Sequence, residues 1–216
     1  MGLFVRNQNN KSEQPLYRLS NAGQTKTLLL VGLGNPGKDY DGTRHNIGFD
    51  CLDHFAEHNE FPAWTTKKDL KCLLAMHTLG DCRVILCKPT TFMNNSGEAV
   101  QAVQNFYKLA DSATIIVHDE LDIPFGQIRL RTGGGSAGHN GIKSISALTG
   151  DNTGRIRIGI ANDFSGQADS ADFVLGKFTS DEQKHLPALR QEVNSIIVEH
   201  VYGDSHLPIE TRSFLI

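Results

Sequence analysis

Two short runs that are mostly apolar, without the alternation of a half-exposed strand, constrain the fold more than any other feature of the sequence. Residues 27–33 (TLLLVGL) and 113–118 (ATIIVH) are too short to cross a membrane as helices, and both are rich in aliphatic side chains. Each run therefore predicts a strand that is buried on both faces. Between them, residues 46–60 and 94–109 repeat apolar side chains at helical spacing. Buried strands that alternate with helices are typical of the α/β class.

A hairpin makes the predicted sheet mixed rather than wholly parallel. Residues 71–79 and 82–88 have the character of strands, and Gly80-Asp81 between them suits a two-residue turn. The remaining predicted elements are a strand at 127–131, a helix at 139–148, a strand at 155–160 and a helix at 181–202. We therefore predict one domain over residues 27–216, with a mixed central β-sheet flanked by helices on both faces. The polar residues 1–26 precede it as a flexible extension.

The composition excludes several classes of protein. Hydrophobic residues make up 39% of the 216 positions, and no apolar run approaches the ~20 residues of a membrane helix. The polar N-terminus has no apolar segment of the kind that a secretory signal requires. The four cysteines form no C-x-x-C pair, which favours free thiols in a reducing compartment. We therefore predict a cytoplasmic protein.

Charge is distributed unevenly along the chain. The net charge of the whole chain is −3, whereas residues 127–157 carry a net charge of +4, with Asp151 as their only acid. The negative total argues against wholesale coating of nucleic acid, but charge acts locally. This segment is therefore a candidate for contacts with phosphate groups.

The first predicted strand leads into Gly32-Leu33-Gly34-Asn35-Pro36-Gly37, which matches the G-x-G-x-x-G of dinucleotide-binding turns. That turn needs a helix whose N-terminal amides face the pyrophosphate. Here Pro36 disfavours helical geometry at Asn35, and residues 37–43 have no helical apolar spacing. No second strand ends in an acid about 20 residues further on. The motif therefore predicts a sharp turn that presents Asn35, and not a dinucleotide site.

Polar residues gather where predicted strands end and predicted helices begin. These segments are Asn35, residues 43–46, residues 90–96, residues 118–120 after the second buried strand, and residues 133–140 ahead of a later helix. In open α/β sheets, ligand sites form just beyond the carboxyl ends of the strands. Each segment alone suits a turn or a helix cap, but the five together predict one site.

His45 and Asp119 are the candidates for acid–base chemistry in this set. An imidazole titrates near neutrality, and a carboxylate from another loop can orient it and stabilise its charged form. No G-x-S-x-G elbow marks a serine nucleophile, so the pair predicts direct attack by an activated water molecule. For either residue alone, a cap or turn role is the plainer interpretation.

Three asparagines can complete such a site. Asn35, Asn94 and Asn140 offer neutral amide groups, which suit a substrate carbonyl that becomes an oxyanion only in the transition state. The alternative role of Asn94 and Asn140 is to cap the helices that begin near them.

A metal ion is the rival explanation for the histidines. His54 and His58 are spaced i, i+4, but they do not form the H-E-x-x-H pattern. His118 and His139 have no apparent carboxylate cluster or cysteine partners. We therefore predict solvated or packed histidines, with no metal and no cofactor.

The basic segment predicts a phosphate-binding face. Its cations, which lie on two alternating strands and the helix between them, are Arg129, Arg131, Lys143, Arg155 and Arg157. Scattered charges usually form a solvated surface, but arginines at alternate positions beside a glycine-rich loop favour contacts with phosphates. Tyr40 and Phe92, close to the proposed catalytic groups, can stack on a base or ribose or simply anchor their loops.

Motifs in five segments resemble those of the bacterial-type peptidyl-tRNA hydrolases. They are G-L-G-N-P-G-K-D-Y from Gly32, T-R-H-N-I-G from Thr43, K-P-T-T-F-M-N-N-S-G from Lys88, H-D-E-L-D-I-P-F-G from His118 and G-H-N-G-I-K-S-I from Gly138. The resemblance continues through R-I-R-I-G-I and F-V-L-G-K-F, so that it covers residues 26–202.

The resemblance implies a monomeric, metal-free enzyme that hydrolyses the ester between a peptide and the 3′ end of tRNA, which recycles tRNA from stalled translation. It also implies that His45 is the catalytic base, that Asp119 orients it, and that Asn35 distinguishes a blocked amino group from a free one. Asn94, Asn140, Tyr40 and Phe92 would contact the substrate or the tRNA 3′ end. Arg129, Arg131, Lys143 and Arg157 would hold tRNA phosphates.

Some features depart from the family pattern, and two rival functions remain open. The departures are the polar extension before Lys26, a short loop at 149–154, and Ser136-Ala137 in the glycine-rich loop. One rival is a non-enzymatic RNA-binding relative, like organellar members that act in intron splicing; the retained catalytic set disfavours it. The other is a small-molecule esterase, which needs no basic face.

Overall fold

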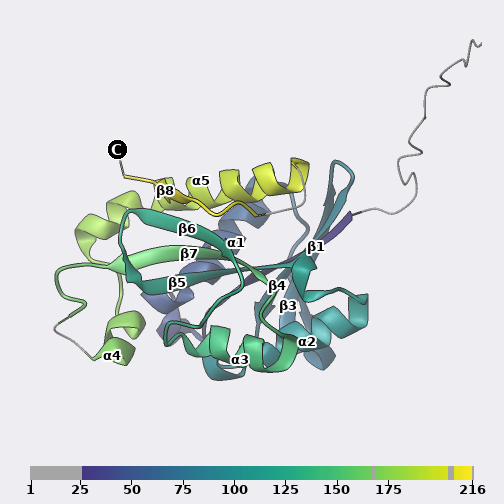
Figure 1. Ribbon diagram of the computed structural model, residues 1–216, viewed down its shortest axis with the longest axis horizontal. Helices are drawn as coiled ribbons and strands as arrows, with labels where there is room; N and C mark the ends of the chain where they lie inside the picture. The colour runs from purple at the N-terminus through teal and green to yellow at the C-terminus, as the bar shows by residue number, and fades with distance from the viewer. Residues whose placement is uncertain (1–25, 167–168, 204–206, 216) are drawn as a thin grey trace, which may run out of the picture.

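A mixed sheet runs through the centre of the molecule (Figure 1). The structure, a computed structural model, describes residues 26–166, 169–203 and 207–215. The strands are β1 (Lys26–Gly32), β2 (Thr65–Lys67), β3 (Cys72–Leu79), β4 (Cys82–Pro89), β5 (Thr114–Pro124), β6 (Gln127–Thr132), β7 (Gly154–Ala161) and β8 (Thr211–Ser213). Their order in the sheet is β2-β3-β4-β1-β5-β7-β6-β8.

Helices cover both faces of this sheet. They are α1 (Ile47–His58), α2 (Ser96–Tyr107), α3 (Asn140–Thr149), α4 (Ser170–Leu175) and α5 (Ser180–Tyr202), with short 3-10 turns that include η1 (Lys38–Tyr40), η2 (Arg44–Asn46) and η4 (Met93–Asn95). Helices α2 and α3 lie side by side on one face, whereas α1 and α5 lie on the other (Figure 1). None of the described helices is both long enough and apolar enough to span a membrane.

The pairing of the strands confirms the predicted mixed sheet. β1 pairs in parallel with β4 and β5, and β5 pairs in parallel with β7. The hairpin of β3 and β4 is antiparallel and turns at Gly80-Asp81, as the sequence predicts. The carboxyl ends of β1, β4, β5 and β7 therefore meet at one edge of the sheet, where the polar segments follow.

The core lies on both faces of the central strands, which explains why β1 is apolar at successive positions. Leu28 and Leu30 pack into the core under α1 and α5. Leu29 and Val31 point to the opposite face and pack under α2 and α3. Because successive side chains of a strand alternate between faces, a strand covered on both sides needs an apolar residue at every position.

The glycine motif after β1 serves close packing and a turn. The chain continues from β1 into η1, and the first α-helix begins only at Ile47, so the dinucleotide arrangement is absent here, as predicted. A Cβ atom on Gly32 would lie 2.4 Å from the backbone oxygen of Gly48 in α1. The missing side chain therefore lets α1 approach the end of β1 closely.

Other elements differ from their predicted limits. β5 continues to Pro124, well past the predicted end at residue 118, because it stays paired with β7 through Glu120 and again at Pro124. The short elements β2, β8 and α4 were not predicted, since so few residues show no hydrophobic period. β1 begins at Lys26, and the rest of the predicted extension lies outside the described residues.

Candidate active site

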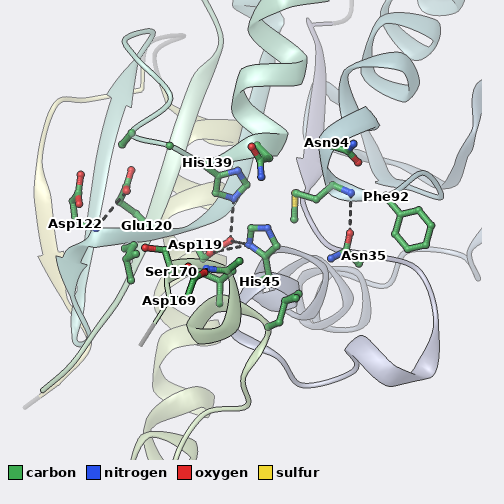
Figure 2. Close-up of a pocket in the computed structure, with 18 residues that line it drawn as sticks. Asn35, His45, Phe92, Asn94, Asp119, Glu120, Asp122, His139, Asp169 and Ser170 are labelled. Carbon is green, nitrogen blue, oxygen red and sulfur yellow. Dashed lines mark hydrogen bonds and ion pairs between the residues drawn. The ribbon is translucent and has the colours of Figure 1, made fainter. Parts of the chain in front are cut away.

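A cavity of about 790 Å³ opens at the carboxyl edge of the sheet. It is lined by residues from all five polar segments singled out in the sequence, together with α4. The predicted site residues in its lining are Asn35, His45, Phe92, Asn94, Asp119 and Asn140. Figure 2 shows these side chains, apart from Asn140, labelled around the cavity. The fold thus brings together groups that are up to about a hundred positions apart in the chain.

His45 and Asp119 form a buried pair at the base of this cavity. The Nδ1 atom of His45 lies 3.0 Å from both carboxylate oxygens of Asp119. Their side chains are only 10% and 2% exposed. The sequence predicted Asp119 in a loop after the strand. The structure places it within β5, whose backbone pairing fixes the position of the carboxylate.

His139 is a second histidine on the same carboxylate. Its Nε2 atom lies 3.0 Å from Oδ1 of Asp119, and its side chain is 5% exposed. The sequence predicts no carboxylate cluster around His139, and the structure brings one carboxylate to it, that of Asp119, which lies 20 positions away in the sequence. We call His45, Asp119 and His139 the His–Asp–His trio (Figure 2).

The surroundings keep Asp119 ionised and its neighbour His118 neutral. Burial alone raises the pKa of the Asp119 carboxyl, but the charges and hydrogen bonds of His139 and His45 lower it by more, so that it lies well below its usual range. Burial, followed by the neighbouring His139, lowers the pKa of His118 well below its usual value. The His118 Nδ1 donates to the backbone carbonyl of Asp119 at 2.6 Å, a contact within β5 next to the trio.

The trio is also the one group among the described residues whose atoms could hold a metal, since its ligand atoms lie within 4.8 Å of one another. A metal would need the lone pair on Nε2 of His139, which requires the ring proton to sit on Nδ1. However, Nδ1 accepts hydrogen bonds from the backbone N–H groups of Gly141 and Ile142. The hydrogen bonds around His139 therefore oppose metal binding.

The two neighbours of His45 anchor the turn that carries it. Arg44 donates to the Lys177 carbonyl and to Glu182, and its guanidinium lies 4.3 Å from the centre of the Phe173 ring. Asn46 donates to the carbonyl of Asn35 and accepts from its backbone N–H. The turn that carries His45 is thus joined on one side to residues 173–182 and on the other to the loop after β1, contacts that the sequence did not predict.

The three asparagines differ in how much of their hydrogen bonding is already used. Oδ1 of Asn35 accepts from the backbone N–H of Met93 at 2.8 Å, which leaves the Nδ2 group to donate. Asn94 and Asn140 are exposed at the cavity, and within the described chain neither side chain has a hydrogen-bond partner. The N-caps of α2 and α3 are Asn95 and His139, so the predicted alternative role in capping does not apply.

The two sides of the cavity differ in character. Asn35, Asn94 and Phe92 lie on one side of His45, whereas Glu120 and Asp122 lie on the other (Figure 2). Phe92 is 56% exposed, and its ring meets the edge of the Tyr40 ring at a centroid distance of 6.3 Å. Burial raises the pKa of the Glu120 carboxyl. The cavity therefore offers an amide and aromatic side and an acidic side.

The predicted basic residues lie outside the lining of the cavity. On the antiparallel strands β6 and β7, Arg129 pairs with Arg157 and Arg131 pairs with Arg155, so all four side chains are on one face. We call these four residues the arginine ladder. Lys143 lies exposed on α3.

The members of the arginine ladder are not equivalent. Arg155 is 2% exposed, and it donates to the carbonyl of Gly135 and to the hydroxyl of Ser146. Arg157 lies 3.9 Å from the buried Glu120. Arg129 and Arg131 are half-buried and have no acidic partner within the described residues. Arg155 therefore holds the glycine-rich loop against α3, Arg157 lies beside an acid, and Arg129 and Arg131 are the members without an acidic partner among the described residues.

Comparison with known sequences places these motifs in one family. A family model described as peptidyl-tRNA hydrolase matches residues 29–207. A peptidyl-tRNA hydrolase of Rickettsia bellii is 44% identical over 155 residues, which cover 72% of this chain and 83% of the relative. One from Clostridium perfringens is 40% identical over 179 residues, which cover 82% of this chain and 93% of the relative.

Solved structures show the same similarity. The crystal structure of peptidyl-tRNA hydrolase from Acinetobacter baumannii is 37% identical in sequence and superposes with a TM-score of 0.71. The superposition covers 82% of this chain and 87% of that chain. The mixed sheet with its flanking helices is therefore the fold of solved peptidyl-tRNA hydrolases.

Proposed function

Because the chain belongs to the peptidyl-tRNA hydrolase family, and is thus an ester hydrolase acting on peptidyl-tRNA, we propose that His45 and Asp119 form its catalytic centre. In this proposal a water molecule attacks the carbonyl carbon of the ester that joins the peptide to the tRNA 3′ end. The reaction has no covalent enzyme intermediate. Its products are a peptide with a free carboxylate and a tRNA with a free 3′ end.

The observation that carries this proposal is the hydrogen bonding of the His45 ring. Nδ1 faces the Asp119 carboxylate, which leaves Nε2 as the nitrogen that can accept a proton. Nε2 takes a proton from the attacking water, and the carboxylate stabilises the imidazolium that forms. When the tetrahedral intermediate collapses and the ester C–O bond breaks, the same nitrogen returns the proton to the leaving 3′ oxygen.

The lining of the cavity supports attack by water. Among the described lining residues, Ser170 is the one side chain with a hydroxyl, and none is a cysteine. An activated serine nucleophile needs a hydrogen bond to its base. Ser170 makes no such bond to His45. Water is therefore the nucleophile that this lining favours.

Asn35 supports selection of peptidyl over aminoacyl groups. Because its Oδ1 is engaged by the Met93 N–H, the group it offers to a ligand is the donor Nδ2. A peptidyl group presents a carbonyl oxygen that can accept this hydrogen bond. A free aminoacyl group instead presents an ammonium that can only donate, so the pairing would fail.

Asn94 and Asn140 are proposed to bind the substrate carbonyl. Both are exposed at the cavity, and their amide groups are not used in capping. The backbone N–H groups of Gly141 and Ile142, which could otherwise hold an oxyanion, already donate to His139. Side-chain amides are therefore the donors left to stabilise the charge that develops in the transition state.

The tRNA is proposed to bind across Phe92 and the arginine ladder. An aromatic ring as exposed as Phe92, with Tyr40 at its edge, suits stacking on the terminal base. Arg129, Arg131, Arg157 and Lys143 would contact phosphates. A monomeric enzyme is part of the proposal, and the hydrogen bonds of His139 support a reaction without a metal. A cytoplasmic location is part of the same proposal.

Hydrolysis of an N-acetylaminoacyl-tRNA tests this proposal, with the unblocked aminoacyl-tRNA as control. The wild type should release tRNA from the blocked substrate only, and chelators should not change the rate. His45→Ala should lower kcat by about 10²- to 10⁴-fold while tRNA binding persists. A His45→Ala enzyme with the wild-type rate would contradict the mechanism.

A further inference from the structure

We propose that His139 is a positioning residue for the Asp119 carboxylate, and that the first turn of α3 fixes which ring nitrogen of His139 carries the proton. The proposal rests on His45 and Asp119 as the catalytic pair. It concerns a histidine that the proposed reaction steps do not use, although its ring lies 4.9 Å from that of His45 between centroids. His139 does not exchange a proton with the substrate in this account; it acts through Asp119.

The end of α3 determines the state of Nδ1. The first backbone N–H groups of a helix have no partner within the helix. Here the N–H groups of Gly141 and Ile142 donate to Nδ1 of His139 at 3.1 and 3.3 Å. A proton on Nδ1 would face both donors and leave both without an acceptor. Nδ1 must therefore present its lone pair, and the ring proton must sit on Nε2.

That proton points at the catalytic carboxylate. Nε2 of His139 donates to Oδ1 of Asp119, while Nδ1 of His45 donates to the same carboxylate from another direction. Both ring nitrogens of His139 are thus engaged, Nδ1 as an acceptor at the helix end and Nε2 as a donor to Asp119. Nε2 of His45 is therefore the imidazole nitrogen of the trio that is left to act as a base.

Two donors from two different elements hold the carboxylate more firmly than one. His45 comes from η2 and His139 from the start of α3, so rotation of the Asp119 carboxylate would break one bond or the other. When His45 becomes an imidazolium, the carboxylate that stabilises it is already in place and needs no rearrangement. The contact also joins the start of α3, where Asn140 lies, to Asp119.

Two substitutions separate the two hydrogen-bonding roles of His139. In His139→Asn, Oδ1 can replace Nδ1 as the acceptor at the helix end, where asparagine is a favourable cap, but nothing donates to Asp119. In His139→Gln, the longer side chain can place an amide N–H near Asp119, but the helix end loses its acceptor. The same change at the exposed His58 of α1, His58→Asn, is the matched control.

The proposal predicts opposite outcomes for the two variants, measured on one N-acetylaminoacyl-tRNA. His139→Asn should keep the thermal stability of the wild type and lose about 10- to 100-fold in kcat, with little change in KM. His139→Gln should keep more of kcat and unfold about 2–4 °C lower. His58→Asn should match the wild type. An Asn variant as active as the wild type, or two variants with equal losses in both properties, would overturn the proposal.

The protonation of the ring can be observed directly by ¹⁵N NMR of the histidine side chains at pH 7. His139 should carry its proton on Nε2 and none on Nδ1, and added Zn²⁺ should leave its signals unchanged. A proton on Nδ1, or a zinc shift shared by His45 and His139, would overturn the assignment. If the wild type instead fails to hydrolyse the substrate, the proposed function fails while the tautomer remains measurable, so the two failures are distinguishable.

Discussion

Asp119 of the His–Asp–His trio lies on β5, next to β7 of the arginine ladder, yet the charged groups of the two clusters differ in how they are paired. The Asp119 carboxylate is 2% exposed and receives hydrogen bonds from two histidines. Arg129 and Arg131 have no acidic partner among the described residues, and Arg157 has Glu120 only at 3.9 Å. The Asp119 charge is already paired with two histidines, whereas the charges of Arg129 and Arg131 have no such partner and can pair with a ligand.

The difference follows from the task proposed for each region. A carboxylate that orients a catalytic base works best when it is already held in place before the reaction begins. Cations that bind a polyanion must remain free to exchange their counterions for phosphates. The Asp119 carboxylate is paired within the fold, whereas Arg129 and Arg131 have no acidic partner among the described residues, so the two clusters predict separate effects on rate and on affinity that substitutions can test.

The largest effect is expected from Asp119→Asn. The amide has one oxygen acceptor for two imidazole donors, and its NH₂ group would face Nδ1 of His45 and favour the wrong tautomer. We expect kcat to fall by about 10³- to 10⁴-fold, in line with the same change in a serine protease triad. Affinity for uncleaved tRNA should not change, because no phosphate contact is lost. A loss of tRNA affinity as large as the loss in rate would show that the trio and the arginine ladder do not have separate effects on rate and affinity.

The second largest effect is expected from Arg155→Met, which keeps the side-chain stem and removes the guanidinium. Although Arg155 belongs to the arginine ladder, it is buried and donates to Gly135 and Ser146. We expect a loss of about 2 kcal/mol in the free energy of unfolding and a decrease in Tm of about 4–8 °C.

The salt dependence of tRNA binding checks this assignment of Arg155 to the fold. When tRNA binding is measured across a salt series, Arg155→Met should show the same slope of log affinity against log salt concentration as the wild type. A smaller slope with unchanged Tm would instead place Arg155 among the phosphate contacts.

The smallest effect is expected from Arg131→Ala and Arg157→Ala. Each should weaken tRNA binding by about 5- to 10-fold and reduce the salt slope by about one, because one phosphate contact is lost. Hydrolysis of a short ester that lacks the tRNA body should be spared. Arg83→Ala on β4 removes the same charge from another strand and serves as the control. Equal losses on both substrates would show that these arginines act on the reaction or the fold.

Much of the fold could be predicted because it depends on local patterns. The run from Leu28 to Val31 is apolar at every position, and such a run fits only a strand that is covered on both faces. The hairpin of β3 and β4 was likewise predictable from a local pattern, the Gly80-Asp81 turn between two strand-like runs. The end of β5 could not be predicted locally, since Asp119 and Glu120 have charged side chains and continue the strand because they pair with Ile158 and Gly159 of β7.

The candidate site was predictable in part for a similar reason. Asn35 follows β1 and His45 precedes α1, where ligand sites of α/β sheets form, and both line the same cavity as Asp119, which lies inside β5 rather than after it. His139 was missed as a partner of Asp119, because nothing within its own segment offers a carboxylate. Its position at the N-cap of α3 was the available signal, since a helix end needs an acceptor there.

The class of fold, the order of strands and helices, and the kinds of side chain gathered at one edge of the sheet could be predicted from the sequence, because they follow from periodicity and turn chemistry. Which charged groups have a partner depends on the packing of the folded chain. Alternation places Arg155 and Arg157 on one face, but the packing of the glycine-rich loop buries the first and leaves the second near Glu120. Burial and pairing depend on what other segments bring to a residue, and that information lies outside any local stretch of sequence.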